Sequence, residues 1–74
     1  MPDISEEVEK LKTLATNKQL NYWEREEVIR ALGDIGSKEA ALALLDIAND
    51  RGLYYWEREL ALSKAREILS AEKV

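Results

Sequence analysis

Apolar residues recur along this chain at the three- and four-residue spacing of an α-helix. The first stretch covers residues 4–15, where a narrow apolar stripe runs among glutamates and lysines: Ile4, Val8, Leu11, Leu14 and Ala15. Similar patterns cover about residues 22–35, 38–49 and 54–71. Short connections favour antiparallel packing of neighbouring helices. The pattern therefore predicts an all-α fold of four antiparallel helices.

Residues with strong preferences for helix ends separate these stretches. Asp3 and Asn21 are each followed by a glutamate three positions later, which is the pattern of a reciprocal N-terminal cap. Gly36 can take the left-handed conformation that ends a helix, and Ser37 can cap the next helix at once. We therefore expect a very tight turn between the second and third helices.

The third predicted helix is apolar over more than half of its circumference. Leu42 and Ala43 widen an arc that six other side chains already form: Ala40, Ala41, Leu44, Leu45, Ile47 and Ala48. A helix so broadly apolar must be covered by more than one neighbour. We therefore expect it to be the central element, whereas the narrow stripe of the first helix places that helix at the polar end of the stack.

A seven-residue string occurs twice in the chain. Residues 20–26 read Leu-Asn-Tyr-Trp-Glu-Arg-Glu and residues 53–59 read Leu-Tyr-Tyr-Trp-Glu-Arg-Glu, so that Trp23 and Trp56, the two tryptophans, stand 33 positions apart. Duplication at such a period is typical of helical repeat proteins, each unit being one helix pair.

The duplication predicts a single domain over residues 1–74 with two units at about 4–36 and 37–70. The second unit replaces both glycines of the first unit's turn with residues that tolerate a helix, so the last helix simply continues. We expect this change to close the array and to make the chain a complete domain.

Composition excludes several classes of function. The chain has no cysteine and no histidine, which removes disulfides, thiol chemistry and the commonest general base and metal ligand. The net charge is −4 and the lysines are dispersed, so the chain offers no basic face for nucleic acid. No apolar run approaches the ~20 residues that cross a bilayer, and the first residues lack a basic signal-peptide region. We expect a cytoplasmic protein that binds neither nucleic acid nor membrane.

A specific pattern begins within the first aromatic string and ends before the second: Arg25-x2-Val28-Ile29-x-Ala31-Leu32-Gly33-Asp34-Ile35-Gly36-Ser37-Lys38-Glu39-Ala40-Ala41-x2-Leu44. This pattern resembles the short HEAT-like repeat first named for phycobilisome lyases. The resemblance covers roughly residues 20–65, and Leu-Gly-Asp-Ile-Gly-Ser is its most specific part. The family usually has an aliphatic residue before the arginine, where this chain has Glu24 and Glu57.

The resemblance implies a minimal two-unit HEAT-like superhelix, and it implies protein–protein interaction or scaffolding as the function. The family also includes subunits of bilin lyases, so an accessory subunit of a lyase-type enzyme is the alternative. A third reading is a designed or idealised repeat protein without a natural function, which the clean duplication permits. With no histidine, cysteine or phosphate-binding glycine loop, we expect no enzyme, no catalytic residue, no cofactor and no metal.

The tryptophans carry the functional hypothesis. At ~100° per residue, Trp23 projects to nearly the opposite side of its helix from the apolar face, and Trp56 does the same. The alternative is that each ring folds over its loop onto Leu20 or Leu53. The predicted protein-binding residues form one aromatic edge: Tyr22, Trp23, Tyr55 and Trp56. The partner would be a different protein or a second copy in a two-fold homodimer.

The remaining aromatic and charged residues have structural interpretations. The tyrosines, Tyr22, Tyr54 and Tyr55, point closer to the core side of their helices. Arg25 and Arg58 are expected to pack their stems and to meet a carboxylate or a helix C-terminus, with Asp34 or Asp46 as a partner. An acidic cluster is expected to be solvated at two helix starts rather than to be catalytic or metal-binding: Glu24, Glu26, Glu27, Glu57 and Glu59.

Overall fold

The computed structural model describes residues 4–71, which form four helices and no strand. The helices are α1 (Ile4–Ala15), α2 (Tyr22–Ile35), α3 (Lys38–Ala48) and α4 (Tyr55–Ala71). The predicted all-α fold is confirmed, and the predicted helix bounds agree to within one residue. The cap predicted at Asp3 lies outside the described residues.

The helix ends take the conformations that their residues favour. The backbone N–H of Asn21 donates to the carboxylate of Glu24 at 3.0 Å, so the Glu24 side chain caps the N-terminus of α2. Gly36 has φ of +68° and donates its N–H to the Leu32 carbonyl at 3.4 Å. The Ser37 hydroxyl then accepts the N–H of Ala40 at 3.1 Å. Two residues therefore suffice to end α2 and start α3.

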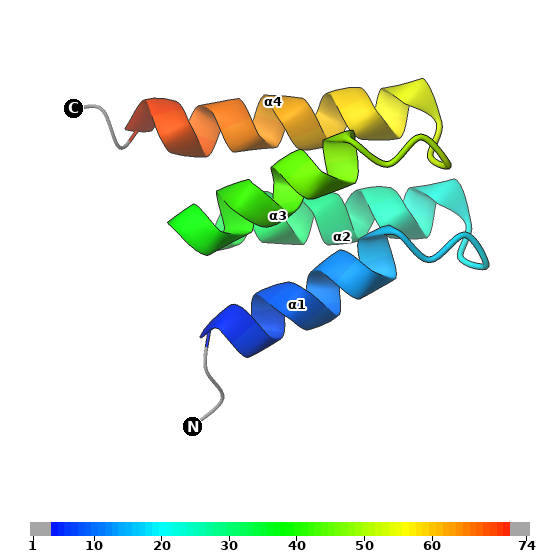
Figure 1. The fold of residues 1–74 in the computed structure, drawn as a ribbon, viewed down its shortest axis with the longest axis horizontal. Coiled ribbons are helices and arrows are strands. Elements are labelled where there is room, and N and C mark those ends of the chain that lie inside the picture. Colours follow the sequence, from blue (N-terminus) through cyan, green and yellow to red (C-terminus); the bar gives the residue numbers. More distant parts are fainter. Residues whose placement is uncertain (1–3, 72–74) are drawn as a thin grey trace.

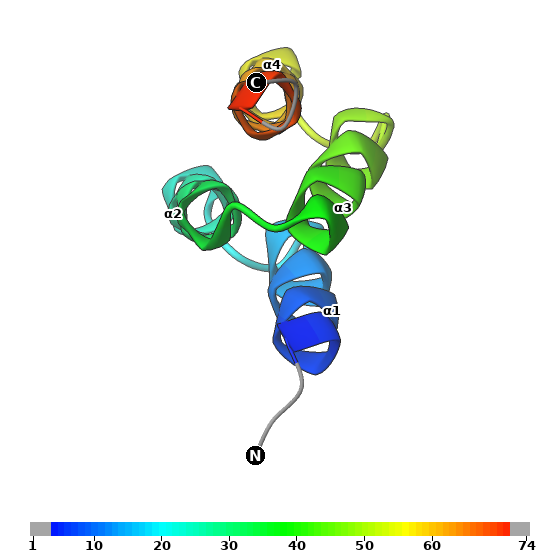
Figure 2. The ribbon, with the colours of Figure 1, turned by 90° about the vertical axis from the view of Figure 1, so that its left-hand side faces the viewer.

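The helices form two stacked pairs, α1 with α2 and α3 with α4. Figure 1 shows α2 and α4 running in one direction and α1 and α3 in the other. The pairs contact each other through α1 and α3, through α2 and α4, and through α2 and α3. Figure 2, which is turned by 90° about the vertical axis of Figure 1, shows α3 between α1 and α4. The central position predicted for α3 is thus shared with α2, because both helices touch the other three.

The core lies where the two pairs meet and contains many alanines, which allow close approach of the helices. Its buried apolar members are Val8, Ala15, Ile29, Leu32, Ala40, Ala41, Ala43, Leu44, Ile47, Leu53, Ala61, Ala65 and Ile68. Leu14 and Leu42, predicted on apolar faces, are exposed. Leu42 lies two residues, about 200° of helical turn, from both Ala40 and Leu44, and Leu14 faces the uncovered side of the α1–α2 pair. Of the four helices described, none has both the length and the apolar composition needed to span a bilayer.

Candidate functional site

Five aromatic side chains gather at the starts of α2 and α4, and we call this surface the aromatic edge: Tyr22, Trp23, Tyr54, Tyr55 and Trp56. The two strings that carry them are far apart in sequence. They lie together because α2 and α4 pack side by side with both starts at the same end of the molecule (Figure 1). The aromatic edge therefore belongs to both helix pairs at once.

The rings of the aromatic edge form a continuous chain of contacts. Trp56 stacks on Tyr54 with centroids 4.5 Å apart and an interplanar angle of 11°. Tyr22 meets Trp23 edge to face at 5.4 Å and Trp56 at 5.9 Å, so it bridges the two pairs. Tyr55 meets Trp56 edge to face at 5.3 Å. Offset-stacked and edge-to-face pairs are the geometries that aromatic quadrupoles favour, so each ring holds its neighbour in place.

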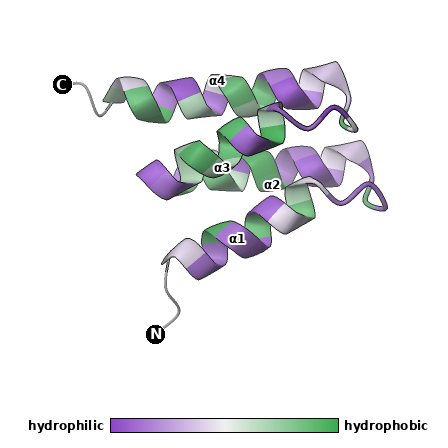
Figure 3. Cartoon of the chain, viewed as in Figure 1, coloured by the Kyte–Doolittle hydropathy of each residue, from purple (hydrophilic) through white to green (hydrophobic). Residues whose placement is uncertain are grey.

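The tryptophans lie where helical geometry predicts. Trp23 is 54% exposed and Trp56 is 40% exposed, so neither ring is buried over its loop. Leu53, one of the two leucines on which a tryptophan ring could fold, is itself buried in the core. In Figure 3 the starts of α2 and α4 are pale, because tyrosine and tryptophan are near neutral in hydropathy. The side-chain chemistry of these residues is what distinguishes the surface.

The interpretation of the tyrosines as core-side residues is wrong. All three are exposed, and Tyr55, at 67%, is more so than either tryptophan. Tyr54 precedes the first residue of α4, so a helical projection does not apply to it. Tyr22 and Tyr55 are the first residues of their helices, and their side chains are exposed although Arg25 and Glu57 of the same turns are buried. Tyr54 therefore joins the four predicted residues, and the Tyr-Tyr-Trp run is the sequence signal for it.

A buried ion pair lies beneath the aromatic edge. Arg25 donates from Nε to one carboxylate oxygen of Glu57 at 2.6 Å and from Nη2 to the other at 2.9 Å. Arg25 is 5% exposed and Glu57 is 0% exposed. Two parallel hydrogen bonds of this kind are the strongest form of such a pair. The pair joins α2 of the first helix pair to α4 of the second.

The same two side chains also hold the loops that lead into the aromatic edge. Arg25 donates from Nη1 to the carbonyl of Leu20 at 2.6 Å, and Glu57 accepts the backbone N–H of Tyr54 at 3.4 Å. The hydrogen-bonded carboxylate of Glu57 raises the pKa of Arg25 above its ordinary value, and this effect outweighs the opposing effect of burial. The ion pair therefore fixes both aromatic strings relative to each other.

Two sequence-based expectations about these charges are wrong. Glu57 is not solvated, because the start of α4 packs against α2 and turns this carboxylate inward. Neither Asp34 nor Asp46 is the partner of Arg25: Asp34 is exposed, and Asp46 accepts from Lys12 at 3.1 Å. The available signal was the duplicated Glu-Arg dipeptide, whose arginine in one string can reach the glutamate of the other.

Most of the other charged residues of the two strings lie as predicted, and Glu26 is the exception. Arg58 donates from Nε to the Ala48 carbonyl at 3.0 Å, which is the expected contact with a helix C-terminus. Three of the other four glutamates are exposed, and Glu26 is half-buried with its carboxylate 3.7 Å from Arg30: the exposed ones are Glu24, Glu27 and Glu59. These acids remain near helix N-termini, where the dipole stabilises them.

A second ion pair links the two loops next to the aromatic edge. Lys18 donates to the carboxylate of Asp50, which also accepts the N–H of Gly52 at 2.9 Å. The hydrogen bond from Lys18 lowers the pKa of Asp50 below its ordinary value. The loop before α2 is thus tied to the loop before α4.

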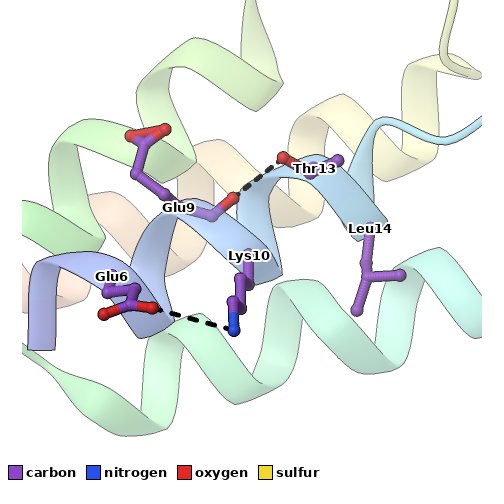
Figure 4. A pocket seen from close by; sticks show the side chains of 5 residues that line it. All are labelled: Glu6, Glu9, Lys10, Thr13 and Leu14. Atoms are coloured by element: carbon purple, nitrogen blue, oxygen red, sulfur yellow. Dashed lines mark hydrogen bonds and ion pairs between the residues drawn. The ribbon is translucent and has the colours of Figure 1, made fainter. Parts of the chain in front are cut away.

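The described residues show neither a metal-binding cluster nor an unpaired buried polar side chain. They contain no group of three or more acidic, histidine or cysteine side chains able to hold a metal ion. Every buried side-chain nitrogen or oxygen among them has a hydrogen-bond partner. Figure 4 shows a hollow whose lining residues all belong to α1, where Thr13 donates to the Glu9 carbonyl at 3.0 Å and Lys10 lies 3.8 Å from Glu6. A hollow with one wall cannot enclose a substrate.

Comparison of the chain with protein-family models, with curated proteins and with solved structures gives no match.

Proposed function

We propose that this protein is a non-enzymatic interaction module that binds another protein through the aromatic edge. The observation that supports the proposal is a continuous surface of five aromatic rings, each at least 40% exposed. Contiguous exposed apolar surface of this kind marks interaction sites on soluble proteins. Tryptophan and tyrosine are also the residues in which binding energy concentrates.

The rigidity of the aromatic edge supports the same proposal. Binding normally costs about 0.5–1.5 kcal/mol for each rotamer-rich side chain that becomes ordered. Here the rings already restrain one another, and the Arg25–Glu57 pair restrains the strings that carry them. Tyrosine and tryptophan have only two rotatable side-chain bonds each. A partner therefore meets a surface that is largely ordered before binding.

We further propose that the two helix pairs are a minimal HEAT-like array and act as a scaffold for this edge. The support is the agreement between the 33-residue duplication and the two stacked helix pairs. In such an array, stacking brings corresponding helix starts to one side. The duplication of the aromatic string then doubles the size of the binding surface.

Selection from a displayed library of peptides and small domains tests the proposed function. The wild-type chain serves as bait, and the selected binders are measured against Trp23→Ser and Trp56→Ser. We expect each substitution to weaken binding at least about 30-fold, corresponding to the 2 kcal/mol that defines a hot spot. Leu42→Ser is the matched control, because Leu42 is similarly exposed but lies away from the edge. Binders that tolerate both tryptophan substitutions would refute the proposal.

A further inference from the structure

The molecule contains one interface between its helix pairs, and half of that interface is repeated on its outer surface. Leu44, Ile47, Glu57 and Ala61 are fully buried where the second pair packs on the first. Their counterparts 33 positions earlier are exposed or half-buried and line an open hollow. We call this hollow the glutamate face: Leu11, Leu14, Leu20, Glu24, Glu27, Val28 and Ala31.

The opposite end of the molecule repeats the other half. Ala15, Arg25 and Ile29 are buried beneath the second pair. Their counterparts 33 positions later are more exposed, and Leu62, which corresponds to Ile29, lies at the surface. These residues line a second hollow, which we call the arginine face: Ala48, Tyr55, Arg58, Glu59 and Leu62.

We propose that copies of this chain associate head to tail, with the arginine face of one copy against the glutamate face of the next. In this arrangement Arg58 donates from its Nη groups to Glu24 of the next copy, while its Nε keeps the bond to the Ala48 carbonyl. The pair is the counterpart of the Arg25–Glu57 pair within the chain. Glu24 can accept this pair while it caps α2, because Glu57 also accepts a backbone N–H and Arg25 together. The surface is distinct from the aromatic edge except for Tyr55, so the inference does not rest on the proposed function.

The side-chain sizes at the two faces support this pairing. Within the chain, the stem of Lys64 passes over Gly33, where a Cβ would lie 2.9 Å from the Lys64 Cδ. The counterpart of Gly33 is Arg66, and the counterpart of Lys64 is Ala31. Within the chain, the large Lys64 of the second pair meets the small Gly33 of the first. Between copies, the large Arg66 of one copy would meet the small Ala31 of the next.

The contact between copies is weaker than the contact within the chain. Two of the internal ion pairs, Lys12 with Asp46 and Lys18 with Asp50, join the helix pairs. Their counterparts at the outer faces are Leu45 with Thr13 and Arg51 with Asn17, which cannot form ion pairs. We therefore expect the copies to associate only towards millimolar concentrations of the protein.

The geometry of association separates this proposal from a two-fold dimer. A head-to-tail contact uses two different faces, so a dimer still exposes one free copy of each face and can add further copies. Sedimentation equilibrium of the full chain should show a weight-average mass that rises with concentration beyond the mass of a dimer. A chain that stays monomeric at millimolar concentration, or a dimer that grows no further, overturns the proposal.

Complementary variants provide the decisive test. Leu14→Glu blocks the glutamate face and Leu62→Glu blocks the arginine face; both leucines are exposed, so the fold tolerates the change. Each variant alone should lose at least about tenfold in association constant, because a charge would be buried without a partner. The two variants mixed should form a one-to-one complex and nothing larger, since each supplies the face that the other lacks. Failure of the mixture to associate overturns the proposal.

Two further variants control for the nature of the contact. Leu42→Glu places the same charge on an exposed leucine away from both faces, and it should leave association unchanged. Reversal of one charge, Glu24→Arg or Arg58→Glu, should weaken association, and the double reversal should restore it. An equal loss in Leu42→Glu, or no restoration in the double reversal, would contradict the specific pairing. Circular dichroism confirms that each variant remains helical.

Discussion

Arg25 and Glu57 join α2 to α4 and also hold the loops that precede these helices. A buried ion pair is not in itself a large source of stability, because desolvation of both charges offsets much of their attraction. Loss of one partner is different, since the other charge is then left buried and unpaired. Here the guanidinium also holds the Leu20 carbonyl, so its position affects a loop as well as two helices. The pair acts as a geometric clamp beneath the aromatic edge.

Neutralisation of Glu57 should therefore destabilise the fold, whereas neutralisation of its counterpart Glu24 should have little effect. We expect Glu57→Gln to lower the free energy of unfolding by about 1.5–3 kcal/mol, the range for hydrogen bonds to charged groups. Glu24→Gln occupies the equivalent position but is exposed, so its effect should stay within about 0.5 kcal/mol. Urea unfolding followed by circular dichroism measures both. Similar losses in the two variants would contradict the burial of Glu57.

Asp50 predicts a dependence of stability on pH. Its pKa is lowered in the folded state, so the unfolded chain binds a proton at a higher pH than the folded chain does. The stabilisation is complete above the unfolded pKa of about 4, and it is lost as the pH falls through the folded pKa. Asp50→Asn should lower the free energy of unfolding by about 0.2–1 kcal/mol near neutral pH, and by less in strong acid.

Urea unfolding at neutral pH and in strong acid measures this difference. Lys18→Met should give the same loss at neutral pH, and combination with Asp50→Asn should add little, because the two side chains share one interaction. A loss that is equal at both pH values would show that the ion pair is not its cause.

The turn between α2 and α3 shows how local residue choice sets an element's length. Gly36 lies at φ of +68°, a conformation that other residues adopt at a cost. Gly33 has no such requirement, because it lies inside α2 and its limit is the approach of Lys64. The two glycines are three positions apart but are favoured for different reasons: Gly36 for its backbone conformation and Gly33 for the close packing of Lys64.

Alanine at each glycine separates these constraints. Gly36→Ala should lower the free energy of unfolding by about 1 kcal/mol or more, because Ala is strained at positive φ. Gly33→Ala should not lower it, since alanine favours a helix by about 0.8–1 kcal/mol over glycine and the flexible Lys64 stem can move aside. Thermal or urea unfolding measures both changes. A loss at Gly33 as large as that at Gly36 would indicate a rigid contact with Lys64.

At the scale of the whole molecule, stacking of the helix pairs creates surfaces that neither pair has alone. The aromatic edge is continuous because Tyr22 of the first pair touches Tyr54 and Trp56 of the second. The same stacking leaves a counterpart of one half of the inter-pair interface at the surface of each end. The proposed binding through the aromatic edge and the proposed association through the ends therefore use different surfaces, which share only Tyr55, and can be tested separately.

Quenching of tryptophan fluorescence tests the edge directly. Trp56→Phe leaves Trp23 alone, and Trp23→Phe leaves Trp56 alone. We expect an external quencher to reach both, and to reach Trp56 less readily because it is the less exposed ring and stacks on Tyr54. In concentrated urea the two variants should become equal. Two rings that resist quenching in the folded protein would eliminate the aromatic edge.

Several features of this structure could be predicted from sequence because they depend on neighbours along the chain. The bounds of α1, the cap at Ser37 and the left-handed Gly36 follow from residue preferences within a few positions. The exposure of Trp23 and Trp56 follows from helical periodicity. The tyrosines could not be placed in this way, because a periodic projection fails at the first residue of a helix and in the loop before it.

What the sequence by itself determined is the four helices, the turn between α2 and α3, and the presence of a duplicated aromatic string. Only the tertiary structure decided that Glu57 is buried while Glu24 is exposed, although the two stand at equivalent positions. It likewise decided that Arg25 pairs across 32 positions of sequence rather than with either predicted aspartate. The physical reason is that nearly identical local sequences have different surroundings in a stack: Glu57 faces the first helix pair, whereas Glu24 is on the outer side of the molecule.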